Sequence, residues 1–254
     1  MSWKLYEGDC LEVMSTFPSD SFDIVFTSPP YNLGNNHHTG NKKHNPYNDN
    51  LDESDYQISQ ISILNEIYRV LKKNGSLIYN HKNRIKKGIQ ITPYEWLLKT
   101  DFVIKQELVW FNRSQNFDKI RFYPMTKRIY WLTKSPKTKL INNINHHDLF
   151  TTKDWKPEGT SKKHTRAFPL KLVEDILKCF PNSFKVLDPF AGSGTVGIAS
   201  HNLNKNCVLI EQKPEYCQII KDRMATVQEL QLEARKQKTL NEFNGQATLD
   251  MPAK

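Results

Sequence analysis

Strand-like and helix-like segments alternate along this chain, and this order constrains the fold more than any other feature. The stretch from Phe22 to Phe26 is β-rich, Tyr56 to Lys73 places apolar residues at helical spacing, and Ser76 to Tyr79 is again β-rich. Further strands are expected at Lys4–Glu7, Phe102–Phe111, Arg128–Leu132, Phe184–Leu187 and Val208–Ile210, and further helices at Leu11–Phe17, Pro93–Lys99, Leu170–Leu177 and Pro214–Phe243. The alternation predicts an α/β fold with a doubly wound, mostly parallel, Rossmann-like sheet.

The length of 254 residues suits a single domain, 1–254, with a sizeable core. Residues 32–50 are rich in Asn, His, Gly and Lys, and residues 141–163 are polar and irregular. Such segments cannot bury a core, so we expect surface loops at both places, facing the partner of the protein. Residues 244–254 are expected to form a loose C-terminal tail.

Charge and cysteine usage narrow the function classes. The chain has 36 Lys and Arg against 27 Asp and Glu, a formal net charge of +9, which suits a polyanion such as nucleic acid, although solubility alone would also explain it. The four cysteines show no CxxC or zinc-finger spacing, so neither a disulfide framework nor a metal site is expected. No apolar run could span a bilayer and no signal peptide is recognisable, so a reduced, cytoplasmic protein without membrane contact is expected.

The first functional candidate is the turn from Thr27 to Tyr31, which directly follows an apolar strand. Its two prolines fix φ and supply no backbone N–H, so the chain is held rigid at the strand end. The Ser28 hydroxyl, the backbone carbonyls and the Tyr31 ring together could hold a flat ring that bears an amino group. The alternative is a structural turn in which Tyr31 only packs.

The second candidate is the glycine-rich turn from Asp188 to Thr195, which also follows a strand. Glycines there let a ligand approach the backbone, and the next helix offers unpaired N–H groups. About twenty residues later, Glu211 ends a strand where it could accept both hydroxyls of a ribose. Asp9 could accept hydrogen bonds from a ligand or simply cap a helix. Because ligands bind beyond the carboxyl ends of parallel strands, both turns should open at one edge of the sheet.

Together, Thr27 to Tyr31 and Asp188 to Thr195 resemble the S-adenosylmethionine-dependent DNA amino-methyltransferases, in the order where the catalytic motif precedes the cofactor motif. The resemblance covers Gly8 to about Tyr216 and implies a Rossmann-like methyltransferase sheet. It implies DNA methylation at the exocyclic N4 of cytosine or N6 of adenine, with S-adenosyl-L-methionine as cofactor and double-stranded DNA as partner. Restriction-modification with a cognate endonuclease, and a monomer or homodimer, are consistent with it. Because family members with Ser at the first motif position mostly resemble cytosine enzymes, Ser28 favours cytosine N4.

The resemblance also assigns roles to individual residues, with no metal. The catalytic residues would be Ser28, Pro29, Pro30 and Tyr31. The cofactor-binding residues would be Asp9, Cys10, Thr165, Phe168, Asp188, Phe190, Ala191, Gly192, Ser193, Gly194, Thr195, Glu211 and Gln212. The target base would be flipped out and stacked on Tyr31. Its amine hydrogens would be accepted by the Ser28 hydroxyl and the Pro29 carbonyl, which aims the nitrogen lone pair at the methyl group.

Two other classes of protein are alternative interpretations of the sequence. Gly192 to Gly197 fits G-x-G-x-x-G, so an NAD-dependent oxidoreductase is conceivable. Against it, the first glycine comes several residues after the strand, and the Ser-Pro-Pro-Tyr turn has no role in hydride transfer. A DNA-binding protein without catalysis would bind no cofactor. Binding measurements with S-adenosylmethionine and with NAD would separate the three.

Overall fold

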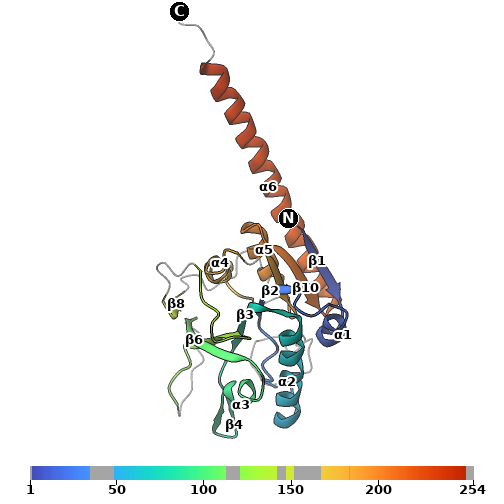
Figure 1. Cartoon of the computed structure of the whole chain (residues 1–254), viewed down its shortest axis with the longest axis vertical. Coiled ribbons are helices and arrows are strands. Elements are labelled where there is room, and N and C mark those ends of the chain that lie inside the picture. The colour runs from blue at the N-terminus through green and yellow to red at the C-terminus, as the bar shows by residue number, and fades with distance from the viewer. Residues whose placement is uncertain are drawn as a thin grey trace, which may run out of the picture.

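A large sheet organises the part of the chain that the computed structural model describes, namely residues 2–34, 49–112, 121–141, 147–151, 167–182 and 184–249. The sheet has eight strands in the order β1-β10-β9-β2-β3-β7-β6-β8 (Figure 1). Their bounds are β1 Trp3–Glu7, β2 Phe22–Thr27, β3 Leu71–His81, β6 Val103–Phe111, β7 Thr126–Thr133, β8 Leu149–Thr151, β9 Lys185–Asp188 and β10 Asn206–Glu211. A separate hairpin pairs β4 Arg84–Lys86 with β5 Ile89–Ile91.

Most neighbouring strands in the large sheet run parallel, as the sequence predicts. The pairs β1·β10, β10·β9, β9·β2, β2·β3 and β6·β8 are parallel, whereas β7 runs antiparallel to both β3 and β6. Strand β2 lies near the centre and is buried on both faces: Ile24 and Phe26 enter one core cluster, and Phe22 and Val25 enter the other. Burial on both faces explains why its sequence is nearly continuously apolar.

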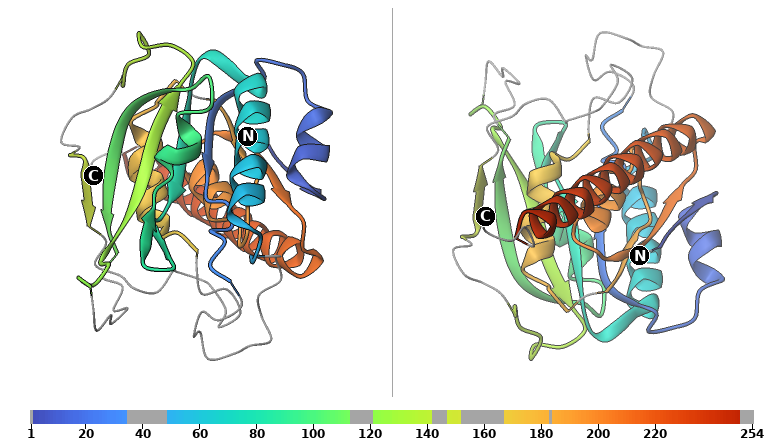
Figure 2. Two further views of the ribbon diagram at one scale, coloured as in Figure 1. Left: turned by 90° about the horizontal axis from the view of Figure 1, so that it is seen from below. Right: turned by 90° about the horizontal axis from the view of Figure 1, so that it is seen from above.

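Helices cover both faces of the sheet. One core cluster joins the sheet to α1 Cys10–Ser15, α2 Glu53–Val70 and α3 Tyr94–Leu97. The other joins it to α4 Leu170–Lys178, α5 Thr195–Asn202 and the start of α6 Pro214–Leu249. The long α6 begins beside the sheet and projects far beyond the other elements (Figure 1), so it points toward the viewer in the right-hand view of Figure 2. The doubly wound α/β prediction is therefore confirmed.

The predicted boundary between α2 and β3 was wrong. The helical spacing extends to Lys73, but α2 ends at Val70, and Leu71 is already extended at φ −76° and ψ 137°. Gly75 is needed for a steric reason: a Cβ there would lie 2.8 Å from Leu71 Cδ1 and 2.9 Å from the Asp23 carbonyl oxygen. The glycine therefore permits close backbone approach where β2 and β3 shift register.

Two expectations about the polar segments also need correction. The predicted loop 141–163 contains the short strand β8, which is held by parallel pairing with the edge of β6. The helix α6 continues to Leu249, so residues 244–249 are helical and not part of a loose tail. No proline occurs between Pro214 and Pro252, which is consistent with this extension. Residues 35–48, 142–146, 152–166 and 250–254 lie outside the described residues.

Two further findings concern membranes and cysteines. Within the described ranges, every helix is too short or too polar to cross a membrane. All four cysteines are buried free thiols, located at positions 10, 179, 207 and 217. Burial raises the pKa of the Cys10 thiol to about 12, and the charge of Asp9 adds to this effect. This thiol therefore stays protonated near neutral pH.

Gly197→Ala should destabilise the fold by about 1 to 3 kcal/mol, the usual cost of overpacking a core. An added Cβ would lie 2.7 Å from Leu209 Cδ1 in β10 and 3.3 Å from Met224 Sδ in α6. Thermal unfolding measures the effect, and Ser62→Ala on the exposed side of α2 is the control, expected to melt like the parent. A Gly197→Ala protein with an unchanged melting temperature would contradict the tight contact.

Candidate active site

The two special turns lie side by side at the carboxyl edge of the sheet. Strands β2 and β9 are parallel neighbours, with Val25 paired to Leu187. Just beyond that pair, the Thr27 hydroxyl donates a 2.9 Å hydrogen bond to Asp188 Oδ1, and both side chains are buried. The last residue of one strand therefore ties the Ser-Pro-Pro-Tyr turn directly to the start of the glycine-rich turn.

A short hydrogen-bond chain fixes the hydroxyl of Ser28. The Tyr31 hydroxyl donates to Asn80 Oδ1 at 2.6 Å, and Ser28 Oγ lies 2.6 Å from the same Tyr31 oxygen. Asn80 Nδ2 donates to the Arg128 carbonyl at 2.8 Å, which fixes the orientation of the amide. Ser28 Oγ also lies 3.4 Å from Asn80 Oδ1, so its proton can go either to Tyr31 or to Asn80. In both arrangements Ser28 donates within this cluster and keeps at least one lone pair to accept a hydrogen bond.

Tyr31 has a structural role that the sequence left open. Its side chain is only 8% exposed, and its ring centroid lies 4.7 Å from that of His81 at a tilt of 55°. Lys127 Nζ lies 5.6 Å from the ring centroid. The ring thus packs and its hydroxyl bonds to Asn80, so stacking on a base remains a prediction and would use the small part of the ring that stays open.

Tyr56 and His81 lie behind the turn, and sequence reasoning did not assign either to the site. The Tyr56 hydroxyl lies 2.7 Å from both the Pro30 carbonyl oxygen and His81 Nε2. His81 Nδ1 faces the Lys82 carbonyl at 2.8 Å, so Nδ1 carries the proton and Nε2 is an acceptor. Burial, reinforced by the charges of nearby cations, lowers the pKa of His81 to about 3, so this ring is neutral. The Tyr56 proton therefore faces two acceptors, one of them in the turn.

Glu211 is buried at the end of β10, where backbone N–H groups grip both of its oxygens. Oε2 accepts from Gly192 N at 2.8 Å, and Oε1 accepts from Lys213 N at 2.8 Å. Gly192 and Gly194 have φ of +53° and +80°, a region that glycine enters without strain. A carboxylate oxygen can accept more than one hydrogen bond, so this arrangement suits a ligand with two hydroxyls.

Asp188 is buried at the start of the glycine-rich turn. Its Oδ1 accepts from Thr27 Oγ1 and from Phe190 N, at 2.9 and 3.0 Å. Burial raises the pKa of Asp188 to about 7; these hydrogen bonds oppose the shift, and the charge of Glu211 adds to it. This carboxyl group therefore titrates near neutral pH, where a ligand's charge can decide its protonation state.

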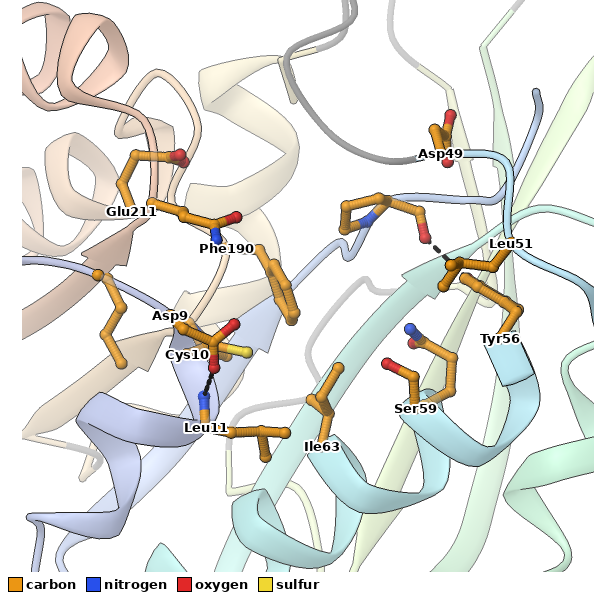
Figure 3. Close-up of a pocket in the computed structure, with 16 residues that line it drawn as sticks. Asp9, Cys10, Leu11, Asp49, Leu51, Tyr56, Ser59, Ile63, Phe190 and Glu211 are labelled. Carbon is orange, nitrogen blue, oxygen red and sulfur yellow. Dashed lines mark hydrogen bonds between the residues drawn. The ribbon is translucent and has the colours of Figure 1, made fainter. Parts of the chain in front are cut away.

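A cavity of about 250 Å³ lies beside these groups (Figure 3). Five predicted cofactor residues line it, namely Asp9, Cys10, Phe190, Glu211 and Gln212, and so does Pro30 of the Ser-Pro-Pro-Tyr turn. Asp9 Oδ1 also accepts hydrogen bonds from the N–H groups of Leu11 and Glu12, so it caps α1 as well as facing the cavity. Carboxylates beside apolar walls fit a ribose attached to a flat ring.

The wall opposite Glu211 comes from α2, which the sequence suggested only as a core helix. Tyr56, Ser59, Gln60 and Ile63 face the cavity from its first turns, as Figure 3 shows for the labelled Tyr56, Ser59 and Ile63. The helical stripe pattern predicts which side of α2 is apolar. It does not reveal that one end of that side lines a cavity.

The remaining predicted residues have different surroundings. Ala191, Ser193 and Thr195 are buried within the turn and do not line this cavity. Arg223 of α6 donates to the Ser193 carbonyl oxygen and braces the turn from behind. Phe168 packs edge-on against Phe26 at 5.3 Å within the core. The predicted cofactor residue Thr165 lies outside the described residues. Among the described residues, no three His, Cys, Asp or Glu side chains form a group that could hold a metal ion.

Comparisons with known proteins place this arrangement in context. The family described as DNA methylase, which comprises N6 and N4 methyltransferases, matches residues 22–222. The Type II methyltransferase M2.MboI of Moraxella bovis is 30% identical over 247 residues, covering 87% of each chain. M.HinfI of Haemophilus influenzae is 27% identical over 252 residues, covering 88% of this chain and 68% of that protein.

Two solved structures share the fold. PvuII DNA methyltransferase, described as cytosine-N4-specific, superposes with a TM-score of 0.71 at 23% identity and covers 87% of this chain and 86% of its own. A putative DNA modification methylase of Thermus thermophilus in complex with S-adenosyl-L-methionine superposes with a TM-score of 0.63 at 21% identity, covering 88% and 93%. At these identities the likeness shows the Rossmann-like methyltransferase fold.

Proposed function

Since the chain belongs to the DNA methylase family of N6 and N4 amino-methyltransferases, we propose that it methylates the exocyclic amino group of a base flipped out of double-stranded DNA. Its cofactor is S-adenosyl-L-methionine, the cofactor of this family. Ser28 at the first motif position favours cytosine N4 as the acceptor, and adenine N6 is the alternative. Membership of this family rules out the NAD-dependent oxidoreductase considered from the glycine pattern.

The observation that carries this proposal is the cluster of hydrogen bonds that Ser28 forms with Tyr31 and Asn80. An aryl amine is a weak nucleophile because its lone pair is delocalised into the ring. A Ser28 oxygen whose proton is directed to Tyr31 or Asn80 keeps a lone pair that can accept an amine hydrogen, which favours a pyramidal nitrogen with a directed lone pair. The Pro29 carbonyl would accept the second hydrogen, as the family resemblance suggests. Asn80 would hold the Tyr31 and Ser28 hydroxyls in place, and Tyr56, through its bond to the Pro30 carbonyl, would brace the turn that contains Pro29.

The cavity beside the turn supports the proposed cofactor site. Glu211 would accept the ribose hydroxyls, and Asp9 would face the adenosine end across the apolar lining. S-adenosyl-L-methionine supplies an electrophilic methyl group on a positively charged sulfur. Pro30 lies in the wall of the same cavity as Glu211, so the proposed cofactor site adjoins the turn that would hold the base. The role of the protein is then to orient the amine toward the methyl group and to exclude water.

A product analysis tests the proposal. The purified protein is incubated with isotopically labelled S-adenosyl-L-methionine and unmethylated genomic duplex DNA, and the DNA is digested to nucleosides and weighed by mass spectrometry. Labelled N4-methylcytosine would support the preferred acceptor, and labelled N6-methyladenine would select the alternative base. The absence of any labelled nucleoside would contradict the proposed activity. Mapping the modified bases in an unmethylated host that expresses the chain would give the recognition sequence.

Cofactor affinity should increase with pH between about pH 6 and 8. The pKa of Asp188 is about 7, and the cofactor carries positive charges, so binding favours the ionised carboxylate. Below this pKa the affinity should fall by up to about tenfold per pH unit, and binding should release a proton. The ligand-free fold has the opposite trend: because the folded-state pKa is raised, this group's contribution to stability declines as pH rises from about 4 to 7.

Calorimetry in buffers of different ionisation enthalpy measures both the affinity and the released proton. The control is Asp188→Asn, which is uncharged but keeps an oxygen for the Thr27 and Phe190 donors. Its affinity should be lower than that of the parent at pH 8 and nearly independent of pH. A parent protein whose affinity stays constant from pH 6 to 8 would show that Asp188 does not sense the cofactor.

A further inference from the structure

We propose that the β4–β5 hairpin is a DNA-contact element whose tip enters a groove of the duplex beside the flipped base. This inference rests on the proposed function, because it assumes that duplex DNA is the substrate. The basic run from Lys82 to Lys87 reads as a solvated surface from sequence alone. Its shape, anchoring and exposed side chains give it a more specific role.

The hairpin is narrow and projects from the edge that carries the site. Strand β3 leads into it, and Tyr79 of β3 pairs with Thr27, so β3 and the Ser-Pro-Pro-Tyr turn point the same way. Lys87 and Gly88 form a two-residue turn with φ of +51° and +83°, typical of the tightest β-hairpins. A Cβ added at Gly88 would meet nothing within 4 Å. Figure 1 shows the hairpin, labelled β4, protruding beyond α3.

The root of the hairpin is linked through side chains to the Ser-Pro-Pro-Tyr turn, which would hold the target base. Arg84 is only 4% exposed and bonds Glu53 of α2 with both terminal nitrogens, at 2.8 and 2.7 Å. Its guanidinium also lies 4.6 Å from the centroid of the Tyr56 ring. Tyr56 in turn lies within hydrogen-bond distance of the Pro30 carbonyl. A contact at the tip would therefore be held in a defined position relative to the target base.

The tip presents apolar side chains between positive charges. Ile89 is 69% exposed and Ile85 is 44% exposed, although isoleucine is usually buried. Lys86 pairs with Ile89 across the hairpin and Lys87 follows at the turn, and neither forms an ion pair with a carboxylate in the part of the chain described here. Residues 82–91 contain four basic and no acidic side chains. Of the four basic side chains, Arg84 forms an ion pair with Glu53.

Duplex DNA matches each of these properties. Its phosphates attract lysines, its major groove admits a two-stranded β-ribbon, and base edges such as the thymine methyl accept apolar contacts. Apolar side chains can also enter between bases where a duplex is opened. An acidic protein would satisfy the lysines but would not explain why the hairpin is attached to the turn that holds the base.

The lysines are tested by the double variant Lys86→Gln and Lys87→Gln. We expect DNA affinity at about 0.1 M salt to fall at least about tenfold, and the slope of log affinity against log salt to decrease by about 1.8, because two phosphate contacts are lost. Fluorescence anisotropy with a labelled duplex measures both quantities. The matched control is Lys73→Gln with Lys137→Gln, two exposed lysines at the opposite edge of the sheet, near the start of β3 and after the end of β7, which should leave the slope unchanged.

The apolar contact is tested separately by Ile89→Thr. This variant should lower DNA affinity about three- to tenfold without changing the salt slope, because no ion is released when an apolar contact is lost. Both the lysine and isoleucine changes are on an exposed tip, and matching melting temperatures would show that the fold is retained. Equal affinity and slope for the parent, the lysine variant and the isoleucine variant would overturn the inference.

Failure of this inference can be distinguished from failure of the proposed function. Calorimetry with S-adenosyl-L-methionine should give the same affinity in the hairpin variants and the parent. A parent that methylates duplex DNA, combined with hairpin variants that bind it equally well, would reject the hairpin and leave the function intact. A parent that neither binds nor methylates duplex DNA would reject the function itself.

Discussion

Ser28→Ala should slow methyl transfer by about 10²-fold and leave the affinity for S-adenosyl-L-methionine within about twofold. The expected loss is large because the hydroxyl is pre-positioned: its oxygen lies 2.6 Å from the Tyr31 hydroxyl and 3.4 Å from Asn80 Oδ1. An acceptor that already has its lone pairs in place needs no reorganisation when the amine becomes pyramidal. Cofactor affinity should be insensitive, because Ser28 does not line the cavity that contains Glu211.

Single-turnover rates with saturating cofactor and duplex DNA isolate the methyl-transfer step from product release. The conservative variant Ser28→Thr keeps a hydroxyl and should retain more activity than Ser28→Ala. Ser59→Ala removes a hydroxyl from the α2 wall of the cavity and controls for a general effect of losing a serine near the site. If Ser28→Ala transfers methyl groups at the parental rate, the hydroxyl takes no part in activating the amine.

The parts of the site that follow from local sequence were predictable. A double proline stops a strand because it has no N–H groups to donate, so the position of Ser28 directly after β2 could be read from the chain. The glycine-rich turn was equally readable, since Gly192 and Gly194 adopt the positive φ that favours glycine. Parallel pairing of consecutive α/β units then predicts that both turns share an edge, as the bond between Thr27 and Asp188 confirms.

The residues that brace the site were not predictable, because they come from tertiary neighbours. Asn80 is an ordinary polar residue in the sequence, and its position depends on the register that pairs Tyr79 with Thr27. Tyr56 fits the apolar stripe of α2, so periodicity assigns it to the core and cannot show that its hydroxyl reaches Pro30. Arg84 reads as one of several surface cations, yet its partner Glu53 lies 31 positions earlier in the sequence.

The helix boundary that sequence analysis misplaced has a similar cause. Leu71 satisfies the helical periodicity of α2, but it is also fully buried as the first residue of β3. Local pattern cannot choose between these uses, because an apolar residue suits either element. Pairing with Phe22 in β2 decides the outcome, and this contact spans 49 positions.

Glu211→Gln should weaken S-adenosyl-L-methionine binding by about 10²-fold or more. Both carboxylate oxygens accept backbone N–H groups, from Gly192 and from Lys213. An amide offers one oxygen and one NH₂, so one of the two backbone donors would face another donor, at a cost of about 1 to 3 kcal/mol. The variant would also lose charge-assisted acceptance of the ribose hydroxyls, and about 1.4 kcal/mol corresponds to tenfold in affinity.

Calorimetry with the cofactor and with an analogue that lacks both ribose hydroxyls separates the two contributions. The parent should lose much of its affinity for the analogue, whereas Glu211→Gln should discriminate far less between the two ligands, because its acceptor for the hydroxyls is impaired. Glu215→Gln, the same change at an exposed position in the first turn of α6, should bind both ligands like the parent. A Glu211→Gln protein that keeps the parental preference for the ribose hydroxyls would show that this carboxylate stabilises only the glycine-rich turn.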